Sequence, residues 1–354
     1  MTITMKSELN LFQSYKFPKT RYQGSKYKLQ SWIKSNLQKL DFETALDAFS
    51  GTSSISYIMK EMNKTVYSND ILKFNYYISK ALIQNNSEQI TKEDFNNIIQ
   101  KKNNYKYATF IKDTFQDIYF LEEENEWLDI VIQNINQLEN ENKQAMFLWA
   151  LFQSCISKRP YNLFHRKNLY VRTADVKRNF GNKTTWDKPF EEHFYKFIKE
   201  INSAIFNNHK NNKAYNKDIF DLDIKVDLVY FDTPYIPQKG TLTHYRDFYH
   251  FLDGLTNYDN WHKEIDYNTK HKKLKSIYNI WEDKKNILNA FENLIKKFQS
   301  SIIVISYRSD GIPTIEEISA ILKKYGKEVT LEIIDYQYVL SKKQNLKEVL
   351  IIGK

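Results

Sequence analysis

Short runs of β-branched and aromatic residues recur along the chain and predict the strands of a sheet. Residues of these types pack well on a pleated, half-buried surface. The predicted strands are 44–49, 65–69, 214–217, 226–232, 301–307, 329–340 and 348–352. The last two runs follow each other closely, so we expect them to form a terminal antiparallel hairpin.

Between these runs, apolar residues recur with the period of an α-helix. Two clear examples are 28–40 and 284–298, in which the apolar residues fall on one face. Strands that alternate with helices favour an α/β fold, in which a mostly parallel sheet carries helices on both faces.

Residues 86–206 interrupt this alternation, because they contain helical patterns and no convincing strand. Helices are predicted near 91–101, 142–157 and 187–206, the first of them opened by a Thr91–Asp94 capping box. We interpret 86–206 as an insertion into a sheet domain that comprises 1–85 and 207–354.

Composition excludes several classes of protein. The chain has 354 residues, of which 42% are hydrophobic, so it can bury a large core. Its one cysteine, Cys155, cannot form an internal disulfide or a Cys-rich zinc site, and the histidines show no HxxxH or HExxH spacing. No apolar run is long enough to span a membrane, and 1–20 lack the pattern of a signal peptide. We therefore expect a cytoplasmic, metal-free protein in which Cys155 is a buried apolar residue.

The formal charge is +9, from 52 Lys and Arg against 43 Asp and Glu. A basic balance fits a polyanionic partner such as nucleic acid. The chain is also rich in Lys, Asn, Ile and Tyr, which is a bias of composition that needs no such partner. Charge alone leaves both interpretations open.

The segment ALDAFSGTSS at 45–54 predicts a strand that ends in Asp47, turns at Gly51 and enters a helix. Such a turn lets a ligand approach the backbone and directs a helix N-terminus at it. The GxGxxG pattern is absent, which disfavours NAD or FAD. Asp70 follows the next strand, 19 residues after Gly51, where doubly wound folds place an acid that binds ribose hydroxyls. A capped turn and a surface acid are the alternatives.

The segment DLVYFDTPYIP at 227–237 predicts a fully apolar strand that runs into Asp232, Thr233, Pro234 and Tyr235. Open sheets bind ligands beyond the carboxyl ends of their central strands. An acid and a backbone carbonyl can accept the two N–H bonds of an exocyclic amine, while an aromatic ring stacks on the base. An ordinary turn at the end of a strand is the alternative.

Taken in order, these motifs resemble those of the D12 class of adenine-specific DNA methyltransferases, which includes the Dam-like enzymes. The similar segments are RYQGSK at 21–26, Asp47 to Gly51, Asp70, Asp218, Asp232 to Tyr235, and KKQNLKEVLII at 342–352. Two positions depart from the family pattern. Ser53 replaces a second glycine, and Thr233 replaces the first proline of a DPPY motif.

The resemblance implies a Rossmann-like S-adenosylmethionine-dependent methyltransferase fold with a mainly helical DNA-recognition insertion. It implies S-adenosylmethionine as the cofactor and double-stranded DNA as the substrate, with a cognate restriction endonuclease as a further partner. The residues implied to contact the cofactor are Tyr22, Lys26, Asp47, Phe49, Gly51, Asp70, Asp218 and Asp232. Lys26 is expected to face the methionine carboxylate, and Tyr22 the ring system.

The resemblance also implies a direct methyl transfer to adenine N6. Asp232 and the Thr233 carbonyl are expected to orient the amine of a flipped base, with Pro234 stiffening the turn and Tyr235 stacking on the ring. A methyltransferase acting on cytosine N4 or on RNA is an alternative, because the motif serves amines generally. A non-catalytic nucleic-acid-binding protein on a decayed enzyme fold is another.

Segment 158–186 combines basic and aromatic residues, and it is the predicted DNA contact. Its candidate contacts are Arg159, Arg166, Lys167, Arg172, Lys177 and Arg178. Asp175 is the only acid in 158–186, so these cations cannot all be neutralised within the segment. We expect several to bind phosphates and at least one to read a base edge. A solvated loop is the alternative.

Overall fold

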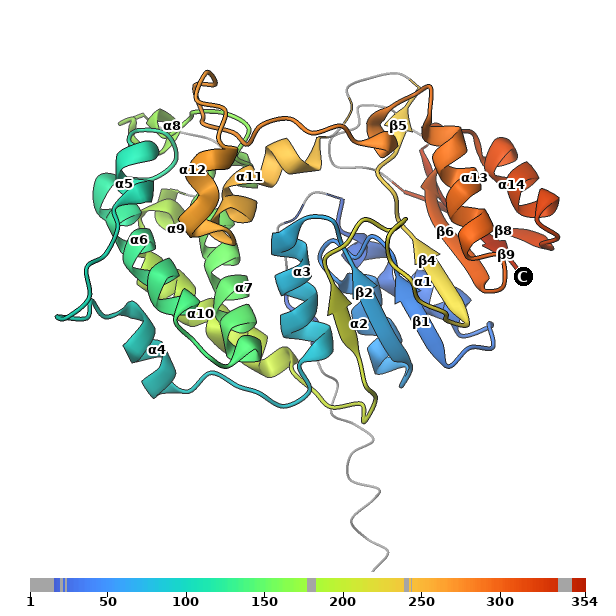
Figure 1. Cartoon of the computed structure of the whole chain (residues 1–354), viewed down its shortest axis with the longest axis horizontal. Helices are drawn as coiled ribbons and strands as arrows, with labels where there is room; N and C mark the ends of the chain where they lie inside the picture. The colour runs from blue at the N-terminus through green and yellow to red at the C-terminus, as the bar shows by residue number, and fades with distance from the viewer. Residues whose placement is uncertain are drawn as a thin grey trace, which may run out of the picture.

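A twisted sheet lies at the centre of the α/β part of the protein, on the right in Figure 1. The computed structural model describes residues 16–19, 22, 24–176, 183–238, 242, 244–336 and 346–354. Within them the sheet has the order β3 (Lys213–Tyr215), β2 (Thr65–Asn69), β1 (Thr44–Asp47), β4 (Leu228–Phe231), β6 (Ile302–Arg308), β9 (Lys347–Gly353) and β8 (Val329–Asp335). Each expected strand has a counterpart. The run expected at 329–340 is β8 as far as Asp335, and its residues 337–340 lie outside the described part of the chain.

The pairing of the strands is parallel from β3 to β6, whereas β9 runs antiparallel to both β6 and β8. The expected terminal hairpin is therefore confirmed, with β9 inserted between β6 and β8. Strands β1, β2 and β3 follow one another toward one edge of the sheet, whereas β4 and β6 follow one another toward the opposite edge. The strand order therefore reverses between β1 and β4. A doubly wound sheet binds ligands at such a reversal.

Helices cover both faces of the sheet, as the alternating pattern predicted. On one face, α1 (Gln30–Leu37) and α2 (Ser54–Glu61) pack in the same core as Leu228 and Tyr230 of β4. On the other face, α13 (Ile287–Lys297) and α14 (Ile315–Lys324) pack with Val229 and Phe231. Successive side chains of β4 thus enter opposite cores, which explains why the strand is apolar throughout.

The inserted region is helical, and no strand occurs in its described parts, 86–176 and 183–206. The three predicted helices are α4 (Lys92–Ile99), α7 (Glu141–Ser157) and α10 (Phe190–Ala204), and α4 carries the expected capping box. The shorter or unpredicted helices here are α5 (Phe110–Thr114), α6 (Glu122–Asn136), α8 (Tyr170–Thr173) and α9 (Lys183–Asp187).

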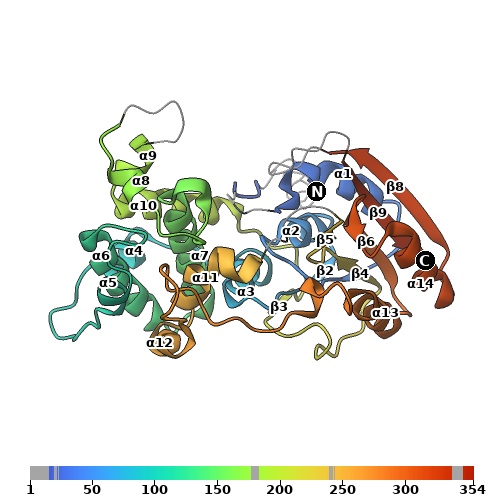
Figure 2. The same cartoon turned by 90° about the horizontal axis from the view of Figure 1, so that it is seen from above.

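A later segment of the chain, 245–264, packs with these helices. The sequence did not indicate this packing. Helix α11 (Tyr245–Leu255) and α12 (Trp261–Glu264) lie against the inserted region in both views (Figures 1 and 2). The Phe164 backbone N–H donates to the Phe248 carbonyl at 2.9 Å, and the rings of Phe164 and Phe251 stack with centroids 5.2 Å apart. The helical part is therefore built from residues both within 86–206 and beyond it.

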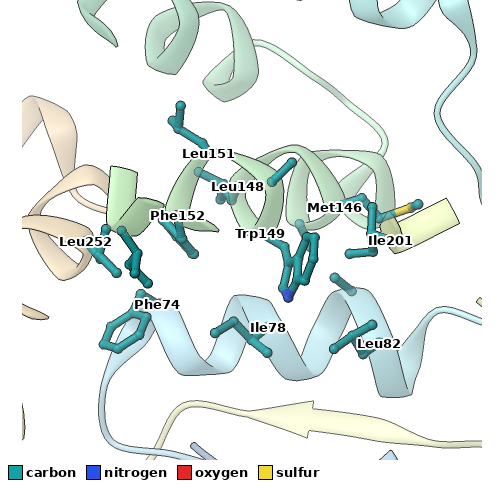
Figure 3. Packing of buried hydrophobic residues seen from close by; sticks show 14 of the residues in the cluster. Phe74, Ile78, Leu82, Met146, Leu148, Trp149, Leu151, Phe152, Ile201 and Leu252 are labelled. Atoms are coloured by element: carbon teal, nitrogen blue, oxygen red, sulfur yellow. The ribbon is translucent and has the colours of Figure 1, made fainter. Parts of the chain in front are cut away.

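Helix α7 connects the helical part to the sheet domain. Its residues 145–157 are all buried, including Cys155, as expected for so apolar a run. Figure 3 shows Trp149 and Phe152 of α7 facing Phe74 and Ile78 of α3 (Lys73–Ser79). One continuous apolar core thus crosses from one part of the molecule to the other.

No helix among the described residues has the length and apolar character needed to cross a membrane. The same residues also contain no group of three or more His, Cys, Asp or Glu side chains placed to hold a metal ion.

Candidate active site

Four carboxylates lie beyond the carboxyl ends of neighbouring strands. Asp47 ends β1, and Asp70, Asp218 and Asp232 follow β2, β3 and β4. All four line a cavity of about 950 Å³. Every residue expected to contact cofactor or target base lines the same cavity: Tyr22, Lys26, Asp47, Phe49, Gly51, Asp70, Asp218, Asp232, Thr233, Pro234 and Tyr235.

The turn after β1 forms one wall of this cavity. Gly51 has φ 48°, and its backbone N–H donates to Oδ2 of Asp70 at 2.9 Å. Ser53, at the position where a second glycine was expected, adopts φ 61°. This is the left-handed region that glycine favours, and the Ser53 hydroxyl is within 2.7 Å of the Ser79 hydroxyl, where the two share a hydrogen bond. The serine therefore follows the path of a glycine turn.

Asp70 accepts one backbone N–H on each oxygen, from Gly51 and from Leu72, both at 2.9 Å. Burial raises the pKa of Asp70 to about 6, and these two hydrogen bonds oppose the rise. The group is therefore predominantly ionised at neutral pH. The carboxylate also forms a hydrogen bond with the Asn75 side chain. With these three bonds it keeps acceptor capacity for a ligand hydroxyl.

Asp47 is more enclosed. Its Oδ2 accepts from the Ser56 hydroxyl at 2.6 Å and from the Ser56 N–H at 3.1 Å. Its Oδ1 is buried and has no hydrogen-bond partner among the described residues. Burial raises the pKa of Asp47 to about 7, against the hydrogen bond from Ser56. An unpartnered buried acceptor beside a cavity suits a ligand that donates to it.

Aromatic side chains form the apolar part of the cavity. Trp281 stacks on Phe220 with centroids 6.0 Å apart and an interplanar angle of 2°, and Phe49 meets Trp281 edge-on at 5.1 Å. Ile71 and Ile277, which also line the cavity, are 58% and 61% exposed. Exposed apolar surface next to Asp70 suits a ligand that combines a flat ring with a sugar.

The turn after β4 forms the other end of the cavity. Burial raises the pKa of Asp232 to about 6, and the nearby Lys26 ammonium opposes the rise. The Tyr235 ring has the Arg308 guanidinium over it at 5.1 Å. Directly after it, β5 (Ile236–Pro237) pairs with β7 (Gly311–Ile312), which fixes the end of this turn to the loop that follows β6.

Lys26 and Tyr22 have protein partners that their expected roles did not include. The Lys26 ammonium contacts Oδ1 of Asp232 at 3.1 Å and Oε1 of Glu348 at 2.9 Å. The ring of Tyr22 stacks on Tyr249 of α11 with centroids 4.5 Å apart. Both residues line the cavity, and their contact with a cofactor stays a prediction.

Sequence reasoning missed Glu348, Trp281, Phe220 and the tyrosines of α11. The sequence carried one signal for Glu348, a charged residue at the start of the apolar run EVLII. In the structure this residue is fully buried. The others lie in segments with no motif, and only the fold brings them to the cavity.

Two of the expected DNA contacts are inside the protein. Arg159 is 1% exposed, and its guanidinium donates to the carbonyls of Leu163, Tyr119 and Arg166. Arg172 is 6% exposed and forms a bidentate ion pair with Glu124, at 2.7 and 2.8 Å.

The expectation that Arg159 and Arg172 contact phosphates is therefore wrong, because both guanidinium groups are buried. Their role is structural. The expectation considered only acids near these residues in sequence, and Glu124 comes from α6. Arg166 and Lys167 are exposed. Lys177 and Arg178 lie outside the described residues.

Together the fold and the site define a doubly wound α/β protein with a nucleotide-type cavity beside an acid–Thr–Pro–Tyr turn. The model of the D12 class N6 adenine-specific DNA methyltransferases matches residues 22–321. The chain belongs to this family, as the sequence motifs indicated, and the mostly parallel sheet is consistent with a Rossmann-like methyltransferase fold.

Three curated proteins are similar over 93% of this chain. The type II methyltransferase M2.HphI of Haemophilus parahaemolyticus is 32% identical over 95% of its own length. The modification methylase StsI of Streptococcus sanguinis and the type II methyltransferase M.FokI of Planomicrobium okeanokoites are 28% and 29% identical, and the match covers 50% of each. The chain thus spans nearly the whole of one relative and half of the other two.

Proposed function

We propose that this protein transfers the methyl group of S-adenosylmethionine to the N6 amine of an adenine flipped out of duplex DNA. The observation that carries the proposal is one cavity with two chemically distinct ends. One end has the Gly51 turn and Asp70, and the other has Asp232 and Tyr235. A donor and an acceptor bound at these ends would share the space between them.

The first end fits the cofactor on several counts. Asp70 can accept hydrogen bonds from ribose hydroxyls, and the aromatic group of Phe49, Phe220 and Trp281 can hold an adenine ring. Asp218, at the same end, can accept from an adenine amine. The unpartnered Oδ1 of Asp47 can accept from the ammonium of the methionine part. When bound, S-adenosylmethionine supplies an electrophilic methyl group on its sulfonium sulfur.

The second end fits the amine that receives the methyl group. The adenine amine is a poor nucleophile, because its lone pair is delocalised into the ring. Asp232 and the Thr233 carbonyl would accept its two N–H bonds, and this favours the pyramidal geometry in which the lone pair is available. Tyr235, held from one side by Arg308, would stack on the base.

A base inside a duplex cannot reach this cavity, so the target adenine must leave the helix, at a cost of about a few kcal/mol. We assign contacts with the flanking phosphates to Arg166 and Lys167, together with Lys177 and Arg178. Exposed cations near the start of α8 suit that role.

The relatives are named type II methyltransferases and modification methylases. We infer by analogy that this protein modifies one DNA sequence in the cytoplasm and protects it from a cognate restriction endonuclease. A role on cytosine N4 or RNA has no specific observation in its favour.

The test is to express the protein in a host without DNA methylation and to map modified bases across the genome. We expect N6-methyladenine at a single recurring sequence. Methylcytosine at that position, or an unmodified genome from well-expressed protein, would overturn the proposal. Saturable binding of S-adenosylmethionine to the purified protein separates an enzyme from a decayed fold, which should not bind it.

A further inference from the structure

Glu348 is a fully buried carboxylate to which the sequence motifs assign no role. It lies at the start of β9, in the C-terminal part of the chain, and its exposed fraction is 0%. Its Oε1 contacts the Lys26 ammonium at 2.9 Å and also accepts from the Ser306 hydroxyl of β6. A buried charge is costly unless it is paired and hydrogen-bonded, and Glu348 is both.

The other partner of Lys26 is the acid at the reaction end of the cavity. The ammonium contacts Oδ1 of Asp232 at 3.1 Å, and the Lys26 side chain is only 6% exposed. One cation thus lies between two carboxylates. Because the contact uses Oδ1, the other oxygen of Asp232 is the one left for an amine, and the side chain is 20% exposed toward the cavity.

We propose that Glu348 is a positioning residue for methyl transfer, which holds the Lys26 ammonium against Asp232 and so fixes the orientation and the charge of that acid. The inference rests on the proposed function in one respect, because it needs ionised Asp232 to accept an N–H of the target amine. It assigns Lys26 to the chemical step, whereas the family resemblance assigns it to the cofactor.

Several other groups surround the cluster. The Lys26 charge acts to lower the pKa of four nearby tyrosines: Tyr230 of β4, Tyr235 after β4, Tyr245 of α11 and Tyr336 after β8. Arg308 of β6 lies over the ring of Tyr235. The tyrosines are neutral near pH 7, since burial raises the pKa of each. The charges that act on Asp232 are those of Lys26 and Glu348, together with the neighbouring acid Asp47.

The cluster predicts pH effects of opposite sign for two isosteric variants. Removing the cation with Lys26→Gln leaves two carboxylates together, and this raises the pKa of Asp232. Glu348→Gln keeps a side-chain oxygen that can accept from the Lys26 ammonium, so the cation stays beside Asp232. It removes only the negative charge that disfavours ionised Asp232, so the pKa of Asp232 falls. Since only the ionised acid accepts the amine, activity should be lost as the pH falls through this pKa.

The experiment measures single-turnover methylation from pH 5.5 to 8.5, with saturating S-adenosylmethionine and DNA, for the wild type and both variants. We expect the acidic limb of the rate profile to move up by at least half a pH unit in Lys26→Gln and down by at least as much in Glu348→Gln. Either variant suffices if the other fails to fold. Glu332→Gln, at the exposed sheet edge, is the control and should leave the profile in place.

Limbs that stay in place or move in the same direction would overturn the inference. So would a Lys26→Gln variant whose only defect is a weaker affinity for S-adenosylmethionine. Asp232→Asn in the same assay separates the two proposals. If Asp232→Asn is inactive and the limbs do not move, the role of Glu348 alone fails. If Asp232→Asn is active, the proposed reaction itself fails.

Discussion

The carboxylates around the cavity differ because their neighbours differ. Asp70 accepts one backbone N–H on each oxygen, Asp47 has one satisfied and one unpartnered oxygen, and Asp232 shares an ammonium with Glu348. Burial raises the pKa of all three acids, to about 6, 7 and 6 respectively. Their hydrogen-bond partners leave different oxygens available, so each ionised acid can accept a different hydrogen bond from a ligand.

Asp70→Ala should weaken the binding of S-adenosylmethionine at least tenfold. The variant removes charge-assisted hydrogen bonds to the ribose, which contribute about 1.5–3 kcal/mol each. Titration calorimetry measures the affinity. Thermal unfolding is the control, because Asp70 also holds the Gly51 turn. A folded variant with unchanged affinity would place the ribose elsewhere.

Asp47 should make stability depend on pH. Its pKa is near 3.8 in the unfolded chain and about 7 when folded, so the protonated acid stabilises the fold. That contribution is fully present below about pH 4 and is lost as the pH rises through 7. Asp47→Asn stays neutral at every pH. Its free energy of unfolding, relative to that of the wild type, should therefore rise by about 2 kcal/mol from pH 5.5 to pH 8. Urea unfolding at the two pH values measures this, and a constant difference would show that Asp47 is charged throughout.

At the scale of elements, segment 158–173 is a rigid support for exposed groups. Arg159 binds the carbonyls of Leu163 and Arg166, while Arg172 anchors α8 to Glu124 of α6. Lys158 also contacts Glu124, at 2.6 Å. The buried cations thus fix the backbone from which Arg166 and Lys167 extend into solvent.

Replacing Arg166 and Lys167 together with alanine should weaken DNA binding for all sequences and reduce its salt dependence. Each lost phosphate contact lowers the slope of log K against log salt by about 0.9. Fluorescence anisotropy at several salt concentrations measures both effects. Lys213→Ala with Lys225→Ala is the matched control, because both lysines are exposed and lie at the amino ends of strands, away from the cavity. Lys213 begins β3, and Lys225 precedes β4. An unchanged slope in the Arg166 and Lys167 variant would remove this segment from the DNA contact.

Strands were predictable because they are short apolar runs between polar turns. The runs around 228–231 and 302–308 must be apolar on both faces, since each face packs against helices. Helix α11 was not predicted, because its burial depends on contacts with Phe164, far away in sequence.

The candidate site was predictable where strands end in acids, and Asp47, Asp70, Asp218 and Asp232 do share one cavity. The pairing of charges was not predictable. Arg172 pairs with Glu124, and Lys26 pairs with Glu348. Both pairs join residues far apart in sequence, so a count of nearby charges does not reveal them.

At the scale of the whole molecule, the helical part and the sheet domain share one apolar core. Residues of β1 and β2, such as Ala45 and Val66, belong to the same buried cluster as Trp149 and Phe197 of the helical part. The cavity also takes residues from both, including Lys273 beyond α12. A shared core should keep the two ends of the site at a fixed distance.

Trp149→Ala should therefore destabilise the whole protein by about 3–5 kcal/mol, the usual cost of emptying a buried aromatic site. Trp149 is fully buried on α7, where it faces α3 (Figure 3). Unfolding should remain one transition, seen alike by far-ultraviolet circular dichroism and by fluorescence. Leu288→Ala, at a partly exposed position of α13, should cost much less. Two separate transitions in Trp149→Ala would show that the parts fold independently.

The central claim is that the turn after β4 performs methyl transfer at adenine N6. The most direct measurement is the single-turnover methylation rate of Asp232→Ala, with S-adenosylmethionine and DNA both saturating. We predict a loss of at least about a hundredfold, the cost of one preorganised electrostatic partner. DNA affinity should stay within a few-fold, since losing an acid does not weaken attraction to phosphates. A rate close to that of the wild type would contradict the account, because Asp232 would then be a structural turn residue.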